Sequence, residues 1–499
     1  MANDEGGLAR RRESGAWRHL ARSRRISSAS PRYTDSVTSI IWFRDDLRFA
    51  DHAALLEASH DPEGVVALYV LDEVSPETRP LGGAAKWWLH HSLAALRRSL
   101  AEFGVPLTLR RGPAERVLPE VVREAGAQRV FWNRRYGPER DVDARLKSRL
   151  RADDIDARSF VGGLLFEPWT IATGEGTAYR VYSAFWRACM REPAPARPLP
   201  APDALAAAPT PVQSDSLEEW GLLDARWAHT LEPCCEPGET AASERLDDFL
   251  DERVSDYDRA RDVPSLPATS GLSPHLRWGE ISPRTVWWRA LEAAGAGHGI
   301  GAGTDHGTGP GADVGGFLSE LGWREFAWHT LFHRGALEST GLDRRYDGFP
   351  WRSGDEIAAR IEAWRCGKTG FGLVDAGMRE LWQTGVMHNR VRMVAASFLT
   401  KNLLVDWRVG EAWFWDTLVD ADRASNPFNW QWVAGCGVDA APYFRVFNPV
   451  TQQKKFDPDG KYVDRWAPDS LLIPPAVDLA ETRQQALDAY EQIRGLPRA

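Results

Sequence analysis

The sequence has little cysteine and lacks long apolar runs. Five cysteines occur in 499 residues, and no two of them form a Cys-x-x-Cys pair. So few cysteines, in an odd number, argue against a disulfide framework, a zinc site or a four-cysteine cluster, and they fit a reducing cytoplasm. No run of about eighteen apolar residues occurs, so we expect no membrane-spanning helix.

An excess of positive charge is also missing. The formal net charge is −9, which taken alone counts against nucleic acid as a partner, although binding needs only a local basic surface. Residues 1–36 are the exception, with eight arginines among Ser, Ala and Gly. We interpret them as a disordered extension, with a DNA-binding arm or a transit peptide as alternatives.

Tryptophan is the residue type in clear excess, with 23 copies. Any single tryptophan is most simply a core residue. Clusters at fixed spacing favour a further use, either stacking on nucleic-acid bases or electron transfer between neighbouring indoles.

From residue 37 the pattern is α/β. Short apolar runs predict buried strands, and helical stretches lie between them. Strand–helix alternation implies a parallel, Rossmann-like sheet that extends to about residue 165. A nucleotide-like chromophore could bind at the carboxyl ends of such strands. The predicted strands are 37–43, 65–71, 106–110 and 129–132, and the predicted helices include 84–103 and 114–125.

After the sheet the composition changes twice. Residues 193–211 are rich in Pro and Ala, which indicates a linker, and after about residue 240 helical patterns continue to the end. A glycine-rich stretch formally contains a dinucleotide fingerprint at 297–302, but it follows a predicted helix and we interpret it as a loop. The predicted division is an extension (1–36), an α/β domain (37–165), a long linker (166–240) and an all-α domain (241–499).

Four segments carry candidate chemistry. In the first, Tyr257 and Arg261 precede Thr269-Ser270-Gly-Leu-Ser273 and a helix at Pro274. Such a helix N-terminus suits a pyrophosphate, although an ordinary N-cap is the simpler alternative.

The second and third segments place polar groups on helix faces. Glu320, Trp323 and Arg324 share one face, where the two charges are costly to bury unless paired or functional. Asn389, Arg392 and Met393 share another.

The fourth segment runs from Asp420 and Asp422 through Asn426 to Trp430 and Trp432. Two aspartates could hold a metal, yet no histidine or third carboxylate is near in the sequence. Hydrogen bonding to a ribityl chain or a ring edge is therefore favoured over Mg²⁺.

The order and spacing of these segments resemble the photolyase/cryptochrome family. The resemblance covers about residues 37–499 and includes the N-terminal stretch 41–48 and Phe166-Glu-Pro-Trp169. It implies an α/β antenna domain and an all-helical domain that binds reduced FAD non-covalently. It also implies that Asn426 faces flavin N5, and that Trp430, Trp407 and Trp351 relay electrons to oxidised FAD.

The implied lesion pocket is similar to that of bacterial enzymes for cyclobutane pyrimidine dimers. Enzymes for (6-4) photoproducts carry histidine at the positions of Asn389 and Met393, and His388 is interpreted as structural. The implied catalytic residues are Glu320, Asn426, Trp430, Trp407 and Trp351; the cofactor contacts are Tyr257, Thr269, Ser270, Leu272, Ser273, Arg324, Asn389, Arg392, Asp420, Asp422 and Asn426; the DNA contacts are Arg261, Glu320, Trp323, Asn389, Arg390, Met393 and Trp432.

Three departures from the family pattern stand out. Gly271 lies where many relatives carry Arg, which removes one cation beside the phosphates. Tyr136-Gly137 replaces a Tyr-Glu pair of folate-antenna members, so a deazaflavin, a folate or no second chromophore stays open. The segment between Trp466 and Pro474 is short.

The sequence therefore predicts a light-driven DNA repair enzyme for pyrimidine dimers, active as a monomer in the cytoplasm. A cryptochrome-type photoreceptor that binds FAD without repair is the first alternative. A flavin oxidoreductase is the second, although the missing dinucleotide fingerprint argues against NAD(P)H.

Overall fold

A computed structural model of the protein describes residues 37–295, 312–440 and 444–497. Contacts divide the chain into residues 1–36 and residues 37–499. The arginine-rich extension and the glycine-rich match at 297–302 lie outside the described residues.

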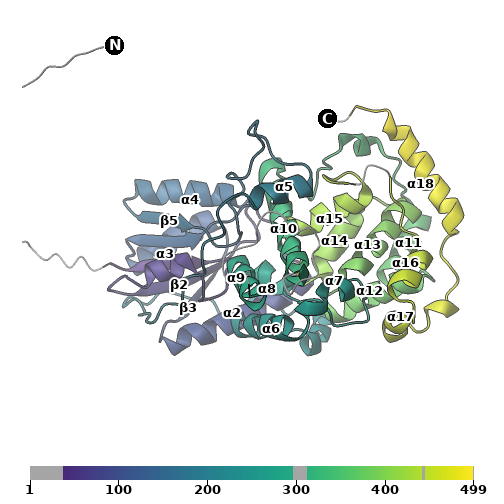
Figure 1. Ribbon diagram of the computed structural model, residues 1–499. Coiled ribbons are helices and arrows are strands. Elements are labelled where there is room, and N and C mark those ends of the chain that lie inside the picture. Colours follow the sequence, from purple (N-terminus) through teal and green to yellow (C-terminus); the bar gives the residue numbers. More distant parts are fainter. Residues whose placement is uncertain (1–36, 296–311, 441–443, 498–499) are drawn as a thin grey trace, which may run out of the picture. The chain divides into compact units, whose positions relative to one another are not determined.

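Five parallel strands form one sheet in the order β3-β2-β1-β4-β5 (Figure 1). Ser39 of the central strand lies opposite both Val65 and Arg129, so β1 and β4 flank the point where the strand order reverses. This confirms the predicted α/β class, and a fifth strand joins the four expected ones. The strands are β1 (Ser39–Phe43), β2 (Val65–Leu71), β3 (Leu107–Arg111), β4 (Arg129–Asn133) and β5 (Asp156–Phe160).

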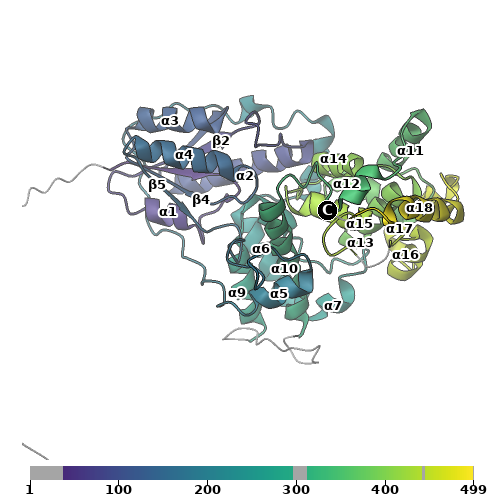
Figure 2. The ribbon, with the colours of Figure 1, turned by 90° about the horizontal axis from the view of Figure 1, so that it is seen from above.

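Helices cover both faces of the sheet because alternate strand residues point to opposite sides. Ile40 and Trp42 pack with α3 (Ala114–Ala125) and α4 (Arg140–Ala152). Ile41 and Phe43 pack with α1 (Ala53–Ala58) and α2 (Gly83–Glu102). Figure 2 shows α3 and α4 on one side of the sheet and α1 on the other.

From Glu239 onward the described chain is helical, as predicted for the part after about residue 240. The stretch 166–240, predicted as a linker, contains three short helices and a bridge from Ala207 to Val65 at the sheet. Its limits as a linker stay a prediction. The helices are α5 (Tyr182–Cys189), η1 (Glu218–Trp220), η2 (Arg226–Cys234), α6 (Glu239–Glu252), η3 (Val254–Asp256), α7 (Tyr257–Ala260), α8 (Ser273–Trp278), α9 (Pro283–Ala293), α10 (Ala312–Arg334), η4 (Arg344–Gly348), α11 (Asp355–Arg365), α12 (Gly372–Thr384), α13 (Asn389–Ser397), η5 (Phe398–Asn402), α14 (Trp407–Thr417), α15 (Ser425–Ala434), α16 (Pro449–Phe456), α17 (Lys461–Trp466), η6 (Ser470–Leu472) and α18 (Leu479–Arg494).

The core of the helical part gathers around α12, α13, α14 and α15. Helix α14 approaches α15 closely at Gly410, where an added Cβ would lie 2.1 Å from the Trp430 ring. Across the described ranges, no helix is both long and apolar enough to cross a membrane.

Candidate functional site

A hydrogen-bonded group around Asp420 joins three segments that are far apart in the sequence. Ser273, at the start of α8, donates to the Asp420 carboxylate at 2.7 Å. Arg392 of α13 donates to both carboxylate oxygens at 3.1 and 2.9 Å, and its Nε donates to the Met387 carbonyl. Three of the predicted cofactor contacts therefore meet around one carboxylate that is 9% exposed.

Asp422 and Asn426 lie at the start of α15, and both are buried. Asp422 accepts from the backbone N–H groups of Ala424 and Ser425, so it holds the turn that leads into the helix. The Asn426 amide nitrogen donates to the Glu411 carboxylate at 2.8 Å and to the Glu411 carbonyl at 3.1 Å. Glu411 was not predicted, although a carboxylate in the middle of the tryptophan-rich helix 407–417 is a signal that could have found it.

A cation stands at the turn where Gly271 replaces the arginine of many relatives. Gly271 has a φ of +65°, and a Cβ there would lie 2.8 Å from a guanidinium nitrogen of Arg245, on α6. The charge that the sequence appeared to lack at this turn is supplied by another helix. Nearby, Leu272 is buried while Thr269 is exposed, and the Tyr257 ring packs edge-on against Phe249 and Phe317.

Four of the residues predicted for the lesion pocket are linked by contacts just after the short helix α7. Arg261 donates to the Glu320 carboxylate at 2.5 Å. Burial alone would lower the pKa of Arg261, but the nearby Glu320 carboxylate raises it above its ordinary value. Asp262, which the sequence did not single out, accepts two hydrogen bonds from Arg390 at 2.6 and 2.8 Å. The Met393 sulfur lies 3.8 Å from the Arg390 guanidinium.

The two predicted stacking tryptophans are linked through the start of α5. The Trp323 ring stacks on Tyr182, with ring centroids 3.8 Å apart and planes 12° from parallel. Trp432 donates through its indole N–H to the Asp439 carbonyl, and the Asp439 carboxylate accepts from the Tyr182 backbone N–H. Both indoles are half-buried, so each keeps an exposed part that could contact a base. Tyr182 was not predicted from the sequence.

The three predicted relay tryptophans lie in one core cluster. Trp430 and Trp407 are buried at 2% and 1% exposure, whereas Trp351 is half-buried. A backbone hydrogen bond from Arg352 to Leu404 brings the Trp351 segment beside the chain that leads into Trp407.

His388 caps helix α13, because its Nδ1 accepts from the Arg390 backbone N–H at 3.2 Å. Burial lowers its pKa to about 4. A neutral capping imidazole agrees with the structural interpretation of this residue.

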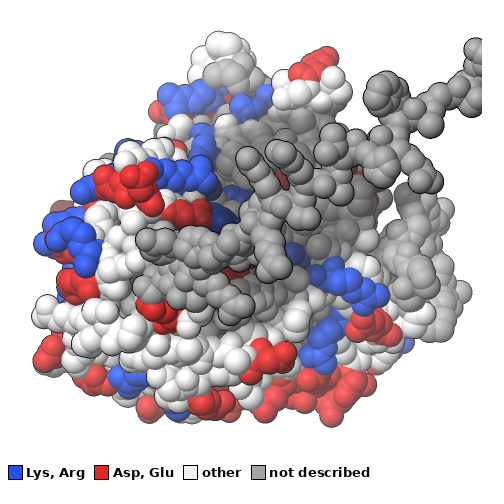
Figure 3. Space-filling view, turned by 90° about the vertical axis from the view of Figure 1, so that its left-hand side faces the viewer, with Lys and Arg blue, Asp and Glu red and all other residues white. Residues whose placement is uncertain are grey.

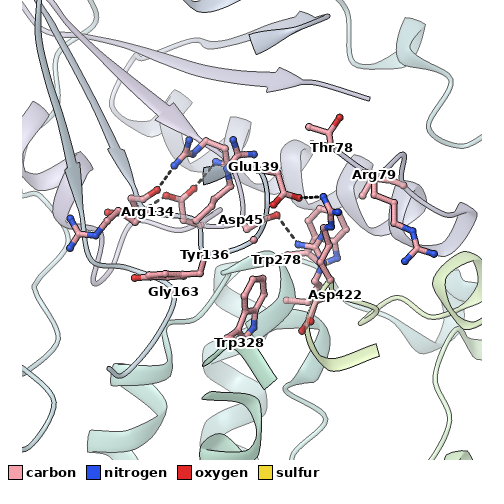
Figure 4. Close-up of a pocket in the computed structure, with 18 of the residues that line it drawn as sticks. Asp45, Thr78, Arg79, Arg134, Tyr136, Glu139, Gly163, Trp278, Trp328 and Asp422 are labelled. Atoms are coloured by element: carbon pink, nitrogen blue, oxygen red, sulfur yellow. Dashed lines mark hydrogen bonds and ion pairs between the residues drawn. The ribbon is translucent and has the colours of Figure 1, made fainter. Parts of the chain in front are cut away.

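A cavity of about 1160 Å³, part of it open to solvent, lies at the carboxyl ends of β1, β2 and β4. Figure 4 shows Tyr136 entering it from the sheet side and Trp328 from the helical side. The Tyr136 hydroxyl, the Trp328 indole N–H and an Asn133 oxygen are buried without a hydrogen-bond partner among the described residues. Arg324 also lines this cavity, where it donates to the Gly163 carbonyl at 2.9 Å.

The lining of the cavity combines charged side chains with aromatic rings. It lies at the reversal of strand order, where α/β sheets bind nucleotides. Its lining includes seven arginines: Arg44, Arg79, Arg134, Arg135, Arg277, Arg324 and Arg423.

A second pocket, open to solvent, lies beside Trp432. Arg180, Arg345 and Arg445 line it, together with the aromatic rings of Phe444 and Tyr490. By contrast, the described surface visible in Figure 3, on the side of the α/β layers, carries Lys and Arg interspersed with Asp and Glu.

Comparison with known proteins identifies this arrangement. The profile described as DNA photolyase matches residues 39–203, and the profile described as the FAD binding domain of DNA photolyase matches residues 317–489. The chain is 47% identical over 433 residues to the deoxyribodipyrimidine photo-lyase of Agrobacterium fabrum strain C58, covering 86% of this chain and 87% of that protein. The chain belongs to the DNA photolyase family.

Solved structures of photolyases agree with this assignment. The crystal structure of a bacterial class III photolyase from Agrobacterium tumefaciens superposes with a TM-score of 0.85 at 43% identity, covering 94% of this chain and all of that one. An archaeal photolyase from Sulfolobus tokodaii, described with two FAD molecules, has a TM-score of 0.75 at 26% identity and covers 91% of this chain.

The photolyase residues present here fit FAD. Asp420, Asp422 and Asn426 are polar side chains buried together within the matched FAD-binding range. Among the described residues, no hydrogen bond reaches the Asn426 amide oxygen, which leaves an acceptor for a ligand. No group of three or more metal-ligating side chains occurs in the described ranges.

Proposed function

We propose that this chain is a light-driven enzyme that splits cyclobutane pyrimidine dimers in DNA, with reduced FAD as its cofactor. One observation supports this most strongly: helix α13 joins the two candidate sites. Arg392 bonds Asp420 on the flavin side, while Arg390 bonds Asp262, the neighbour of the Arg261 that holds Glu320.

A bound, reduced FAD would supply the chemistry, which is the light-driven loan of one electron to the dimer; the two ring bonds that join the pyrimidines would then break and the electron would be returned. Ser273, Arg392 and Asp420 would hold the cofactor, and Asn426 would face N5. Glu320 would hydrogen-bond the edge of the dimer and stabilise its transient negative charge.

Trp323 and Trp432 would stack on a dimer that has been flipped out of the duplex, which costs less for a lesion that already stacks badly. The basic groups Arg261 and Arg390 suit the flanking phosphates. Every group named above belongs to one chain, so we propose that the monomer is the active unit.

We further propose that the α/β cavity holds a second, light-harvesting chromophore of deazaflavin or folate type. Support comes from its unpartnered Tyr136 and Trp328 groups and from its place at the strand ends. Gly137 departs from the folate-antenna pattern. The Glu139 carboxylate occupies the space that a side chain at position 137 would need.

The choice of lesion tests the proposed function. We expect the reduced protein under blue light to remove cyclobutane dimers from DNA and to leave (6-4) photoproducts in a parallel sample unchanged. The same cyclobutane substrate kept in the dark is the control. Loss of (6-4) photoproducts with retention of cyclobutane dimers would refute the proposed substrate.

A further inference from the structure

Arg79 lies in the connection between β2 and α2, yet it reaches a helix more than 300 residues later. Both of its terminal nitrogens donate to the Glu411 carboxylate, at 2.7 and 2.9 Å. Its guanidinium also lies 4.0 Å from the centre of the Trp415 ring. Because Glu411 and Trp415 are four residues apart on α14, they share a helix face. Arg79 is thus fixed by two contacts on one face.

Glu411 links Arg79 to Asn426, because it contacts both side chains. Its side chain is 2% exposed, and in the described ranges its ion pair is with Arg79. The Asn426 amide nitrogen has two hydrogens, and both Glu411 acceptors, the carboxylate at 2.8 Å and the backbone carbonyl at 3.1 Å, lie in reach of it. The amide oxygen is therefore directed away from Glu411.

We propose that Arg79 is a positioning residue that, through Glu411, holds the Asn426 amide with its oxygen toward flavin N5. This rests on the proposed function, which places N5 at Asn426. Reduction of the flavin adds a proton to N5, so an amide oxygen can accept from N5 only in the reduced cofactor. The amide nitrogen would instead suit the oxidised cofactor, whose N5 is an acceptor. By holding this orientation through Glu411, Arg79 favours the reduced flavin over the oxidised flavin without contacting the cofactor itself.

The role of Arg79 follows from the burial of Glu411. A buried carboxylate that loses its cation is strongly disfavoured, so without Arg79 the Glu411 side chain should take up a proton or turn away. The Asn426 amide would then be free to rotate.

The interface between this connection and α14 supplies a matched control. The Asp416 carboxylate, also on α14, accepts from the Gly83 backbone N–H at 2.8 Å, and among the described residues no hydrogen bond joins it to Glu411 or Arg79. Asp416→Ala therefore loosens the same interface while leaving the Arg79–Glu411–Asn426 chain intact.

The test measures the midpoint potential of bound FAD in the full-length holoprotein, by equilibrium titration against a reference dye, together with the melting temperature. For Arg79→Gln we expect the ratio of reduced to oxidised flavin at a fixed potential to fall about tenfold, which equals about 30 mV for a two-electron couple. Arg79→Lys keeps the charge but loses the paired geometry, so a smaller shift is expected. Asp416→Ala should lower the melting temperature and leave the potential unchanged.

A double-mutant cycle sharpens the result. Glu411→Gln should shift the potential as Arg79→Gln does, and the double variant should shift it no further. The inference is overturned if Arg79→Gln retains the wild-type potential, if Asp416→Ala shifts it equally, or if the two shifts add. If Arg79→Gln does not bind FAD, the other two variants decide. In that case the inference is overturned if Arg79→Lys and Glu411→Gln both have the wild-type potential. Absence of dimer repair by the wild-type chain would count against the proposed function, whereas the potentials decide this inference.

Discussion

Charged side chains at the candidate site are held by partners from other segments. Arg261 pairs with Glu320, Arg390 with Asp262 and Arg392 with Asp420. These pairs keep long, flexible side chains in place before any ligand arrives, which reduces the entropy lost on binding.

The first prediction concerns Glu320. We expect Glu320→Ala to lower the number of dimers repaired per absorbed photon about tenfold, since a hydrogen bond to a charged group contributes roughly 1.5–3 kcal/mol. FAD should stay bound, because Glu320 contacts Arg261 and not the Asp420 group. The yield is measured with chemically reduced protein saturated with dimer DNA, so that a change in DNA affinity does not contribute. An unchanged yield would remove Glu320 from its proposed role.

The second prediction concerns Glu325, on α10. Burial raises its pKa from the ordinary 4.5 to about 7. The positive charge of Arg324 and the hydrogen bonds from the Leu165 and Phe166 N–H groups lower this pKa but do not cancel the effect of burial. The charged form is disfavoured in the folded state, so stability should fall as pH rises from about 5 to 7 and then level off, by about 3 kcal/mol in total.

Glu325→Gln keeps an acceptor for both N–H groups and removes the charge. We expect Glu325→Gln to have a higher melting temperature than the wild type, and the difference between the two should be larger at pH 8 than at pH 5. A difference that stays constant with pH would show that Glu325 does not titrate in this range.

The family resemblance predicted several cofactor contacts, and their role at the cofactor stays a prediction. Ser273, Arg392 and Asp420 were expected at the cofactor, and the structure brings them together. Sequence reasoning missed Glu411 and Tyr182, because their roles depend on contacts with Asn426 and Trp323 that only the tertiary fold creates.

At the scale of elements, α14 and α15 pack closely against each other at Gly410. Gly410 allows the Trp430 ring to lie directly on the α14 backbone. This contact positions one proposed relay tryptophan and the start of the helix that carries Asn426.

The third prediction tests that contact. Gly410→Ala should lower the free energy of unfolding by about 1–3 kcal/mol, because a new methyl group would overlap the Trp430 ring. Gly315→Ala on α10 is the matched control: its Cβ meets nothing within 4 Å, so helix propensity should raise stability by up to about 1 kcal/mol. Chemical denaturation of both variants checks the sign. A stabilising Gly410→Ala would contradict the close packing.

Elements with an alternating or continuous apolar pattern were predicted well. The strand Val65–Leu71 and the helix Ala114–Ala125 have the expected limits. Strand β5 was missed because it lies at the sheet edge and its sequence, DARSF, has only one fully buried residue, Ala157.

At the scale of the whole molecule, two sites on different layers of the fold serve one reaction in our account. A chromophore bound in the α/β cavity would absorb light. The group around Asp420 would hold the FAD that uses this light energy. The Arg79–Glu411 pair connects the two, because Arg79 also lines the α/β cavity.

The fourth prediction separates the relay from repair. Trp407→Phe should block light-driven reduction of oxidised FAD, because the middle tryptophan of the proposed relay is gone, and it should leave repair by chemically reduced protein intact. Flavin absorbance during illumination and dimer loss are followed in the same preparation. Loss of both would refute a role restricted to the relay.

The most direct test of the account is the number of cyclobutane dimers removed per molecule of reduced protein during continuous blue illumination with excess dimer DNA. We predict many dimers removed per protein molecule, all of them dependent on light. Efficient photoreduction of the flavin without any loss of dimers would contradict the account and identify a photoreceptor.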